Sequence, residues 1–316
     1  MDLVQGMQCR DRRALARAIS LVENGTPQRE ELVVQAFRHR RKAPVIGVTG
    51  APGVGKSTLV DGLAACFREG GRTVGIVAVD PTSPFTGGAI LGDRVRMQRH
   101  GHDPGVFIRS LATRGHLGGL SRATGEVIRL MDWFGFDVII VETVGAGQSE
   151  VDIMGFATTV LVVTVPGLGD DVQAIKAGIM EIGDVFCVNK ADREGVARAV
   201  MEIQMMLDFK PPGDWRPPVV EAIATTGQGI PELAQHLDEH RAHLESSGQL
   251  AQRQARTFLT EVGEVLKEQL VDYVLERARA GGDLEELATR AGDPFSAARY
   301  LAEKYGGIKS RWPQEG

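Results

Sequence analysis

Apolar residues recur along this chain with two different spacings. Short uninterrupted apolar runs are typical of strands buried on both faces of a sheet, and they lie at Val45–Thr49, Thr73–Val79, Asp137–Val141, Thr159–Val165, Val185–Val188 and Val219–Ala222. Apolar residues three or four positions apart predict helices between these runs, at residues 57–68, 121–133 and 231–244. Strands that alternate with helices predict an α/β domain built around a mostly parallel central sheet.

Helical segments flank this α/β pattern on both sides. Two helices are predicted before the first strand, and a long amphipathic helix followed by a shorter one is predicted after the last. The long helix ends at Gly281-Gly282, and the shorter one follows Asp293-Pro294. The pattern therefore predicts three parts: an N-terminal helical extension at residues 1–43, an α/β domain at 44–245 and a C-terminal helical arm at 246–316.

The long C-terminal helix carries apolar side chains that must be buried against a partner. They include Phe258, Val262, Leu266 and Tyr273. Two surfaces can cover them, the α/β domain of the same chain or a second copy of the chain. We favour the second copy and therefore expect a homodimer.

Composition narrows the class of protein. The 316 residues are 43% hydrophobic and 24% charged, with a net charge of −5, so no overall basic field argues for nucleic-acid binding. No apolar run approaches the length of a membrane span, so we expect no membrane association. Cys9, Cys66 and Cys187 are scattered and form no CxxC pair, which favours neither a disulfide framework nor a zinc site. A reducing cytoplasm is the expected location.

The stretch between the first strand and the next helix fits G-x-x-x-x-G-K-[ST], the phosphate-binding loop of many NTPases. Glycines let backbone N–H groups come close to phosphate oxygens. Lys56 is expected to bring its charge to the β- and γ-phosphates, and the Ser57 hydroxyl is placed to ligate Mg²⁺. The residues expected to bind nucleotide here are Gly50, Ala51, Pro52, Gly53, Val54, Gly55, Lys56, Ser57 and Thr58.

Acidic residues follow two other predicted strands. Asp80 comes at the end of one strand, beside a proline, where it is either a turn residue or a carboxylate near Mg²⁺. A glycine-rich loop then leads to Asp93, with the length and composition of a loop that orders around a γ-phosphate. Glu142 ends the next strand at the Walker B position. Because Mg²⁺ usually takes one or two carboxylates, these acids cannot all be direct ligands at once.

Gly145 follows Glu142 by three residues, and its N–H is expected to meet the γ-phosphate. Ras-like proteins orient the attacking water with a glutamine directly after this glycine, whereas here that position is Ala146. Gln148 lies two residues further along. We therefore expect slow intrinsic hydrolysis unless another group orders the site.

Asn189-Lys190-Ala191-Asp192 fits N-K-x-D at the end of a later predicted strand. A carboxylate at Asp192 can accept hydrogen bonds from N1–H and N2–H₂ of guanine, and adenine offers neither donor there. A site built for such donors rejects an analogue that lacks them by about 10⁴–10⁵-fold. Ala224 follows the last strand, where GTPases contact guanine O6 through a backbone N–H.

Two segments leave alternatives open. Residues 94–122 carry six arginines and one acid, Asp103, and form either a solvated face or a positive edge near the nucleotide. Asp170, Gln173 and Lys176 follow a glycine-rich loop at helical spacing. They are either a further moving part of a nucleotide switch or an ordinary capped helix start.

These motifs together resemble the MeaB/ArgK family of P-loop GTPases, which includes the human methylmalonic aciduria type A protein. The resemblance extends over nearly the whole chain and is most specific at Glu142-Thr-Val-Gly-Ala-Gly-Gln-Ser-Glu150. It implies a G domain of the SIMIBI type, that of signal-recognition and metal-insertion GTPases, flanked by N- and C-terminal helical extensions.

The resemblance also implies roles for individual residues. Lys56 and Ser57 would serve phosphate and Mg²⁺, and Asp80, Asp93 and Glu142 would surround the metal. The residues that match the family's coupling switches are Gln148, Asp170, Gln173 and Lys176.

Family members use GTP and Mg²⁺, cycle to GDP, and gate delivery of adenosylcobalamin to a cobalamin-dependent acyl-CoA mutase. They also help to remove inactivated cofactor, which protects or reactivates the mutase. The implied partners are that mutase and, as a second candidate, a cobalamin adenosyltransferase. Two other functions remain open. One is a metallochaperone GTPase for a nickel enzyme, and the other is a P-loop kinase that acts on a transport protein.

Overall fold

The computed structural model describes residues 2–80, 100–112, 122–143, 155–167, 179–209, 214–289 and 293–307. The chain folds into two compact units, Met1–Thr257 and Phe258–Gly316. The long helix α12 (Gln249–Ala280) begins in the first unit and continues into the second. The three-part division expected from the sequence, with boundaries at residues 43 and 245, stays a prediction.

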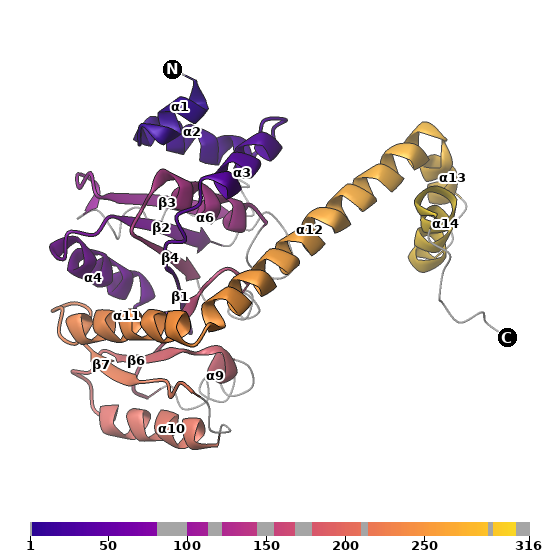
Figure 1. Ribbon diagram of the computed structural model, residues 1–316. Coiled ribbons are helices and arrows are strands. Elements are labelled where there is room, and N and C mark those ends of the chain that lie inside the picture. Colours follow the sequence, from indigo (N-terminus) through magenta and orange to yellow (C-terminus); the bar gives the residue numbers. More distant parts are fainter. Residues whose placement is uncertain are drawn as a thin grey trace. The chain divides into compact units, whose positions relative to one another are not determined.

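A seven-stranded parallel sheet forms the centre of the first unit (Figure 1). Its strand order is β3-β2-β4-β1-β5-β6-β7, and each neighbouring pair is parallel. The strands are β1 (Val45–Thr49), β2 (Val74–Asp80), β3 (Val106–Ala112), β4 (Val138–Thr143), β5 (Thr159–Thr164), β6 (Val185–Asn189) and β7 (Val219–Ala222). This confirms the predicted α/β fold. The central strands are buried along their whole length because helices cover both faces.

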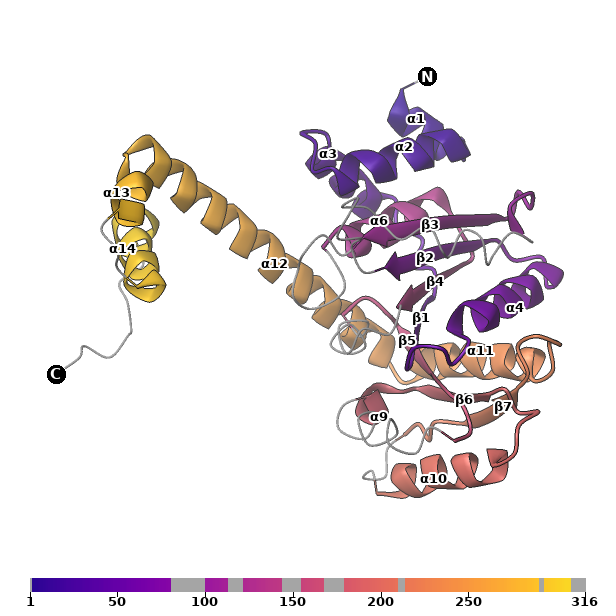
Figure 2. The same ribbon diagram turned by 180° about the vertical axis from the view of Figure 1, so that it is seen from behind.

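One face of the sheet is covered by α4 (Lys56–Glu69) and α11 (Ile230–Ser246), which lie side by side in Figures 1 and 2. Leu59, Leu63 and Phe67 of α4 belong to the core on this face, as their helical spacing predicts. They pack with alternate residues of the strands, among them Val48 and Ile140. Burial of this face holds the first turn of α4 against the carboxyl end of β1.

The other face is covered by two groups of helices. Over β1–β4 lies α6 (Arg122–Phe134), and on it pack α1 (Leu3–Gln8), α2 (Arg12–Glu23) and α3 (Arg29–Arg38) of the N-terminal extension. Over β5–β7 lie α9 (Ile179–Ile182) and α10 (Val196–Asp208), with Ile203 and Leu207 buried. The carboxylate of Asp132 on α6 accepts hydrogen bonds from the N–H groups of Arg41, Lys42 and Ala43, which fixes the chain between extension and sheet.

Five described elements were not predicted from the sequence. The first is β3, which lies within the arginine-rich stretch 94–122. There Arg109 is neither on a solvated face nor at a nucleotide edge, because its guanidinium pairs with Glu23 and donates to Ser20 of α2. The others are α1, α9, α10 and α13 (Asp283–Thr289). We predicted strands from uninterrupted apolar runs, and Arg109 interrupts the run in β3, an edge strand of the sheet. The sequence pattern therefore did not indicate this strand.

The start of α12 is fixed to the first unit through a buried carboxylate at the beginning of β6. Asp184 accepts two hydrogen bonds of 2.8 Å from the guanidinium of Arg253 and one of 2.9 Å from the N–H of Val160. The Trp215 indole donates to the Asp184 carbonyl at 2.8 Å. Bidentate pairing satisfies a charge that would be costly to bury alone.

His240 of α11 lies in the same cluster and is 1% exposed. Its Nε2 is 3.3 Å from Asp184 Oδ1, and its Nδ1 is 2.9 Å from Thr159 Oγ1. Burial lowers the pKa of His240 to about 4, although the nearby Asp184 acts in the opposite direction. The imidazole is therefore neutral at physiological pH, so its 3.3 Å contact with Asp184 is not an ion pair.

The second unit contains the rest of α12, α13 (Asp283–Thr289) and α14 (Pro294–Gly306). Asp283 accepts hydrogen bonds from Lys304 Nζ and the Tyr305 hydroxyl, both at 2.6 Å to the same oxygen. Asp293 caps α14 by accepting from the N–H groups of Phe295 and Ser296, as expected for Asp-Pro at a helix start. Among the residues that the structure describes, no helix is long and apolar enough to cross a membrane.

The first prediction concerns pH and His240. The unfolded state binds a proton on this imidazole below pH 6.5, whereas the folded state does not until about pH 4, so stability falls as pH drops through that window. Between pH 7.5 and pH 5 the wild type should lose about 2 kcal/mol more unfolding free energy than His240→Gln. Urea titrations measure the difference. An equal pH dependence of the unfolding free energy in the wild type and His240→Gln would contradict this account.

Candidate functional site: a phosphate loop and a base loop at one edge of the sheet

The carboxyl ends of the parallel strands bring the predicted nucleotide-binding motifs to one edge of the first unit. The phosphate loop follows β1, and the N-K-x-D motif begins with the last residue of β6. Ala224 comes two residues after β7. In open parallel sheets, ligands bind outside the carboxyl ends of the strands.

The phosphate loop depends on glycine at two close approaches. Gly50 has φ +141°, and a Cβ there would lie 2.1 Å from the carbonyl oxygen of Val163. Gly55 has φ +92°, and a Cβ there would lie 2.5 Å from Asn189 Nδ2. Backbone atoms can pass so close only because glycine lacks a side chain. The loop is thereby packed against β5 on one side and against the N-K-x-D motif on the other.

Lys56 lies inside the loop and is 6% exposed. Its ammonium donates to the carbonyl oxygens of Gly50 at 2.6 Å and Ala51 at 3.0 Å. Lys56 is the first residue of α4, and its side chain reaches back to the start of the phosphate loop. The ammonium charge is therefore held against the backbone of the loop. A cation in this position, beside a helix N-terminus, favours an anion such as a phosphate.

The two predicted metal-binding side chains from the phosphate loop and the Walker B position are in contact. Ser57 Oγ donates to Glu142 Oε1 at 2.6 Å, and both residues are buried. Glu142 ends up beside the loop because β4 pairs with β1 in register Val48↔Glu142. Hydroxyl and carboxylate oxygens are the donors that Mg²⁺ takes, so this pair fits a magnesium site.

Asn189 joins the phosphate loop to the loop after β7. Its Nδ2 donates to the carbonyl oxygen of Val54 at 2.8 Å, and its Oδ1 accepts from the N–H of Ala224 at 3.1 Å. The side chain is 2% exposed. The Ala224 N–H, expected from the sequence to meet guanine O6, is therefore donated to Asn189 in this structure. Its contact with guanine stays a prediction.

Lys190 and Asp192 extend the site outward. Lys190 adopts φ +57°, and its Nζ donates to the Gly53 carbonyl at 2.7 Å, so its stem lies along the phosphate loop. Asp192 is exposed in the turn that follows, which the Arg193 N–H closes by donating to the Lys190 carbonyl. Thr58 and Pro52 are also exposed at this edge.

Several predicted site residues lie outside the described residues, namely Asp93, Gly145, Gln148, Asp170, Gln173 and Lys176. Of Asp80 the structure describes the backbone, which ends β2 opposite Ala112 of β3. The register Val79↔Thr143 places this strand end beside the end of β4, where Glu142 lies. Asp80 is therefore close to the Ser57–Glu142 pair along the edge of the sheet.

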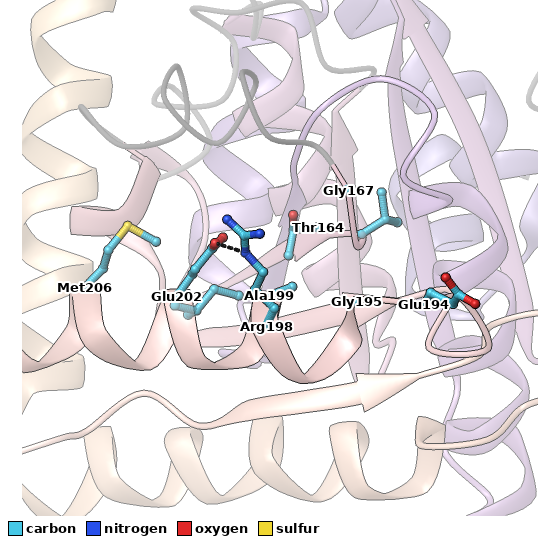
Figure 3. A pocket seen from close by; sticks show the side chains of 10 residues that line it. Thr164, Gly167, Glu194, Gly195, Arg198, Ala199, Glu202 and Met206 are labelled. Carbon is cyan, nitrogen blue, oxygen red and sulfur yellow. Dashed lines mark hydrogen bonds and ion pairs between the residues drawn. The ribbon is translucent and has the colours of Figure 1, made fainter.

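A pocket of about 300 Å³ lies next to these loops, between the end of β5 and α10 (Figure 3). Thr164 and Gly167 form one wall, and Ile203 and Met206 belong to the other. Arg198 and Glu202 form an ion pair at 2.9 Å within it. The sequence did not predict this pocket, because α10 was not predicted. None of the residues that line it belongs to the phosphate loop or to the N-K-x-D motif.

Comparison with known proteins shows which class of protein this chain belongs to. The solved structure of a LAO/AO transport system kinase superposes with a TM-score of 0.72 at 25% identity, covering 96% of each chain. A protein of Pyrococcus abyssi named "Putative GTPase" is 49% identical over 311 residues, covering 96% of both sequences. The mitochondrial methylmalonic aciduria type A homolog of Caenorhabditis elegans is 34% identical over 271 residues. The matched region covers 79% of this chain and 68% of the homolog's sequence.

The protein is a P-loop GTPase. More narrowly, residues 15–279 match the model of the family described as methylmalonyl Co-A mutase-associated GTPase MeaB, and the chain belongs to that family. Membership confirms the resemblance inferred from the motifs and implies that the protein binds guanine nucleotide.

Proposed function

We propose that this protein is a GTP-hydrolysing chaperone that gates delivery of adenosylcobalamin to a cobalamin-dependent acyl-CoA mutase and protects or reactivates that enzyme. The match of residues 15–279 to the mutase-associated family is the observation that carries the proposal. The contacts among Ser57, Glu142, Asn189 and the phosphate loop support the GTP-binding and hydrolysis part of the proposal. A cobalamin adenosyltransferase is a second candidate partner. Cys9, Cys66 and Cys187 are free thiols, which supports the cytoplasm as the location.

In this proposal the base is read by the loop that begins at Asn189. Asp192 accepts hydrogen bonds from guanine N1–H and N2–H₂, and Lys190 packs its stem over the ring. Asn189 holds this loop at a fixed distance from the phosphate loop through its bond to the Val54 carbonyl. Adenine would leave the Asp192 carboxylate without donors, which is the physical basis of selectivity for GTP.

The phosphate end is held by Lys56 and Ser57. Lys56 exchanges its carbonyl contacts for β- and γ-phosphate oxygens, and Ser57 with Glu142 holds Mg²⁺, joined by Asp80 or Asp93. When bound, Mg²⁺ neutralises charge that develops on the phosphate oxygens. Water attacks the γ-phosphorus in line with the bond to GDP, while Lys56 and the N–H of Gly145 stabilise the transferring group. We also assign Asp93 and Gln148, which lie outside the described residues, to this step, Asp93 with the metal and Gln148 with coupling.

The second prediction tests guanine reading. Asp192→Asn replaces an acceptor by a group that also donates toward guanine, so GTP affinity should fall at least about 100-fold while xanthosine triphosphate becomes the better ligand. Fluorescence titration with both nucleotides measures this exchange. Asp208→Asn, an exposed carboxylate at the end of α10, serves as the matched control and should bind GTP as the wild type does. Unchanged GTP affinity in Asp192→Asn would remove this residue from the base site.

The third prediction tests the chaperone role. Because Ala146 takes the position of the water-orienting glutamine, the isolated protein should hydrolyse GTP slowly, and added client mutase should raise the rate at least about ten-fold. Single-turnover hydrolysis with and without mutase measures the stimulation. Lys176→Ala should abolish it, whereas Lys267→Ala, which removes an exposed cation of α12, should not. A full rise in Lys176→Ala would show that the 170–176 segment does not couple nucleotide to client.

The second unit supports a homodimer as part of this proposal. Its apolar side chains on α12 and α14 remain exposed, including Leu259 at 67%, Leu266 at 52% and Phe295 at 76%. A run of exposed apolar residues along one long helix is typical of an interface. A second copy of the chain, which presents the same surface, can cover it by two-fold symmetry.

The fourth prediction tests this interface by sedimentation velocity. Full-length protein should sediment as a dimer at micromolar concentration, and Leu266→Glu should sediment as a monomer that still binds GTP. Lys267→Gln changes the net charge by the same amount at an exposed position about 100° around the helix from Leu266 and should leave the dimer intact. A wild type that is monomeric under these conditions would exclude the dimer.

A further inference from the structure

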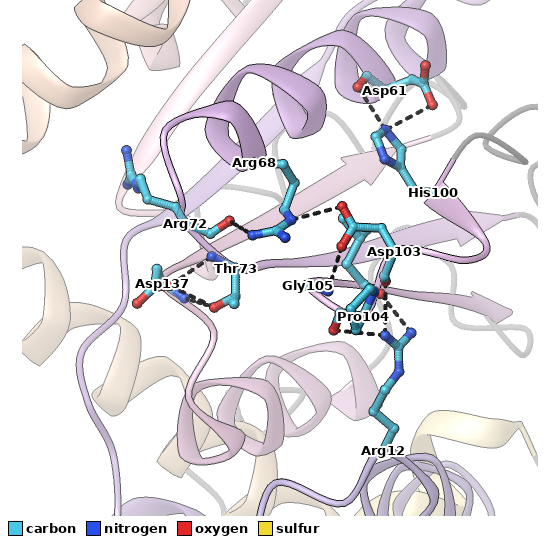
Figure 4. Close-up of polar contacts among 11 residues, drawn as sticks. Arg12, Asp61, Arg68, Arg72, Thr73, His100, Asp103, Pro104, Gly105 and Asp137 are labelled. Atoms are coloured by element: carbon cyan, nitrogen blue, oxygen red, sulfur yellow. Dashed lines mark hydrogen bonds and ion pairs between the residues drawn. The ribbon is translucent and has the colours of Figure 1, made fainter.

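The segment from His100 to Val106 leads into β3 and braces the helix that starts at the phosphate loop. Arg68 Nε of α4 donates to Asp103 Oδ2 at 2.9 Å, and this bond lowers the pKa of the Asp103 carboxyl. At the other end of the segment, His100 Nε2 lies 3.1 Å from the Asp61 carbonyl and 3.3 Å from Asp61 Oδ1. Two turns of α4 are thus tied to one short segment (Figure 4).

The sequence of the segment is adapted to these contacts. Gly105 lies against the Arg68 guanidinium, and a Cβ there would come within 2.2 Å of the Arg68 Cζ. The Gly105 N–H donates to Asp103 Oδ1 at 2.7 Å, and the Gly105 carbonyl accepts from the Val74 N–H at the start of β2. His100 is buried, with 8% of its surface exposed. The segment is therefore packed at its two ends, through His100 and through Gly105 and Val106, whereas Gly101, His102 and Pro104 are exposed.

The N-terminal extension holds this segment through one side chain. The guanidinium of Arg12, the first residue of α2, donates to the carbonyl oxygens of Asp103 at 3.1 Å, Pro104 at 2.9 Å and Val106 at 2.7 Å. It also lies over the Phe107 ring, 5.6 Å from the centroid. Figure 4 shows Arg12 approaching the segment from the side opposite Arg68. Only a planar group with several fixed donors can reach three carbonyls in one turn.

We propose that Arg12 is a positioning residue for the nucleotide site. The path is continuous: Arg12 fixes the 100–106 segment, this segment fixes Asp61 and Arg68, and these residues fix α4. Lys56 and Ser57 are the first two residues of α4, so a displaced α4 moves both phosphate-binding side chains. The N-terminal extension thereby sets how tightly the protein holds nucleotide. The proposal requires GTP and GDP binding but not the mutase partnership.

The test measures dissociation of a fluorescent GDP analogue together with the thermal midpoint. Arg12→Ala should release the analogue at least about five-fold faster than the wild type, a coupling of the usual size for linked sites. The control is Arg29→Ala, because Arg29 also ties the extension to the first unit, through Glu126 of α6, and does not contact the 100–106 segment. A merely structural role predicts that both variants lower the thermal midpoint and leave release unchanged, or change it equally. Either result would overturn the proposal.

Two further variants keep the test decisive if Arg12→Ala does not fold. Arg12→Lys keeps the charge but cannot bridge three carbonyls, so it should release GDP faster than the wild type while folding normally. Arg68→Ala breaks the other side of the brace. Combined with Arg12→Lys, it should add little to the effect of either change alone, because both act through one segment. Wild-type release in Arg12→Lys, or full additivity of the two changes, would contradict the proposed path.

Discussion

The side-chain amide of Asn189 is the contact on which the candidate site depends. One end holds the Val54 carbonyl in the phosphate loop, and the other holds the Ala224 N–H in the loop after β7. The amide is buried, so losing either partner would leave a polar group unsatisfied in the interior. Gly55 is required at this point, because a side chain there would displace the amide. A single residue, Asn189, therefore fixes the distance between the phosphate-binding loop and the base-binding loop.

The fold supplies the rigidity that this contact needs. β1 lies in the middle of seven parallel strands, and the core on its two faces fixes both the start of α4 and the end of β4. The Ser57–Glu142 contact follows from that register. A second set of polar contacts holds α4 from its outer side. Arg68 of α4 bonds to Asp103, and Arg12 of α2 bonds to the carbonyl of the same aspartate. At the opposite edge of the sheet, the bidentate Asp184–Arg253 pair fixes the start of α12.

The sequence predicts the fold well wherever apolar runs are uninterrupted. It misses β3 because Arg109 interrupts the run, and only the structure shows that Glu23 of α2 pairs with that charge. It misses α10, where Met201 and Met205 are exposed although Ile203 and Leu207 are buried, so apolar residues alone do not mark the buried face. Motifs predict the residues of the site, since phosphate and guanine chemistry demands them at fixed spacings. No motif predicts Arg12, whose partner Asp103 lies 91 positions away in the chain.

The affinity of Asn189→Ala for GDP tests the central claim most directly, measured by calorimetry beside the wild type and Asn24→Ala, a residue at the C-terminal end of α2. If Asn189 sets the distance between the two loops, its loss should weaken GDP binding at least about ten-fold, because the loops must then be ordered when the ligand binds. Asn24→Ala should bind as the wild type does. GDP affinity in Asn189→Ala equal to that of the wild type would contradict the claim that this amide organises the site.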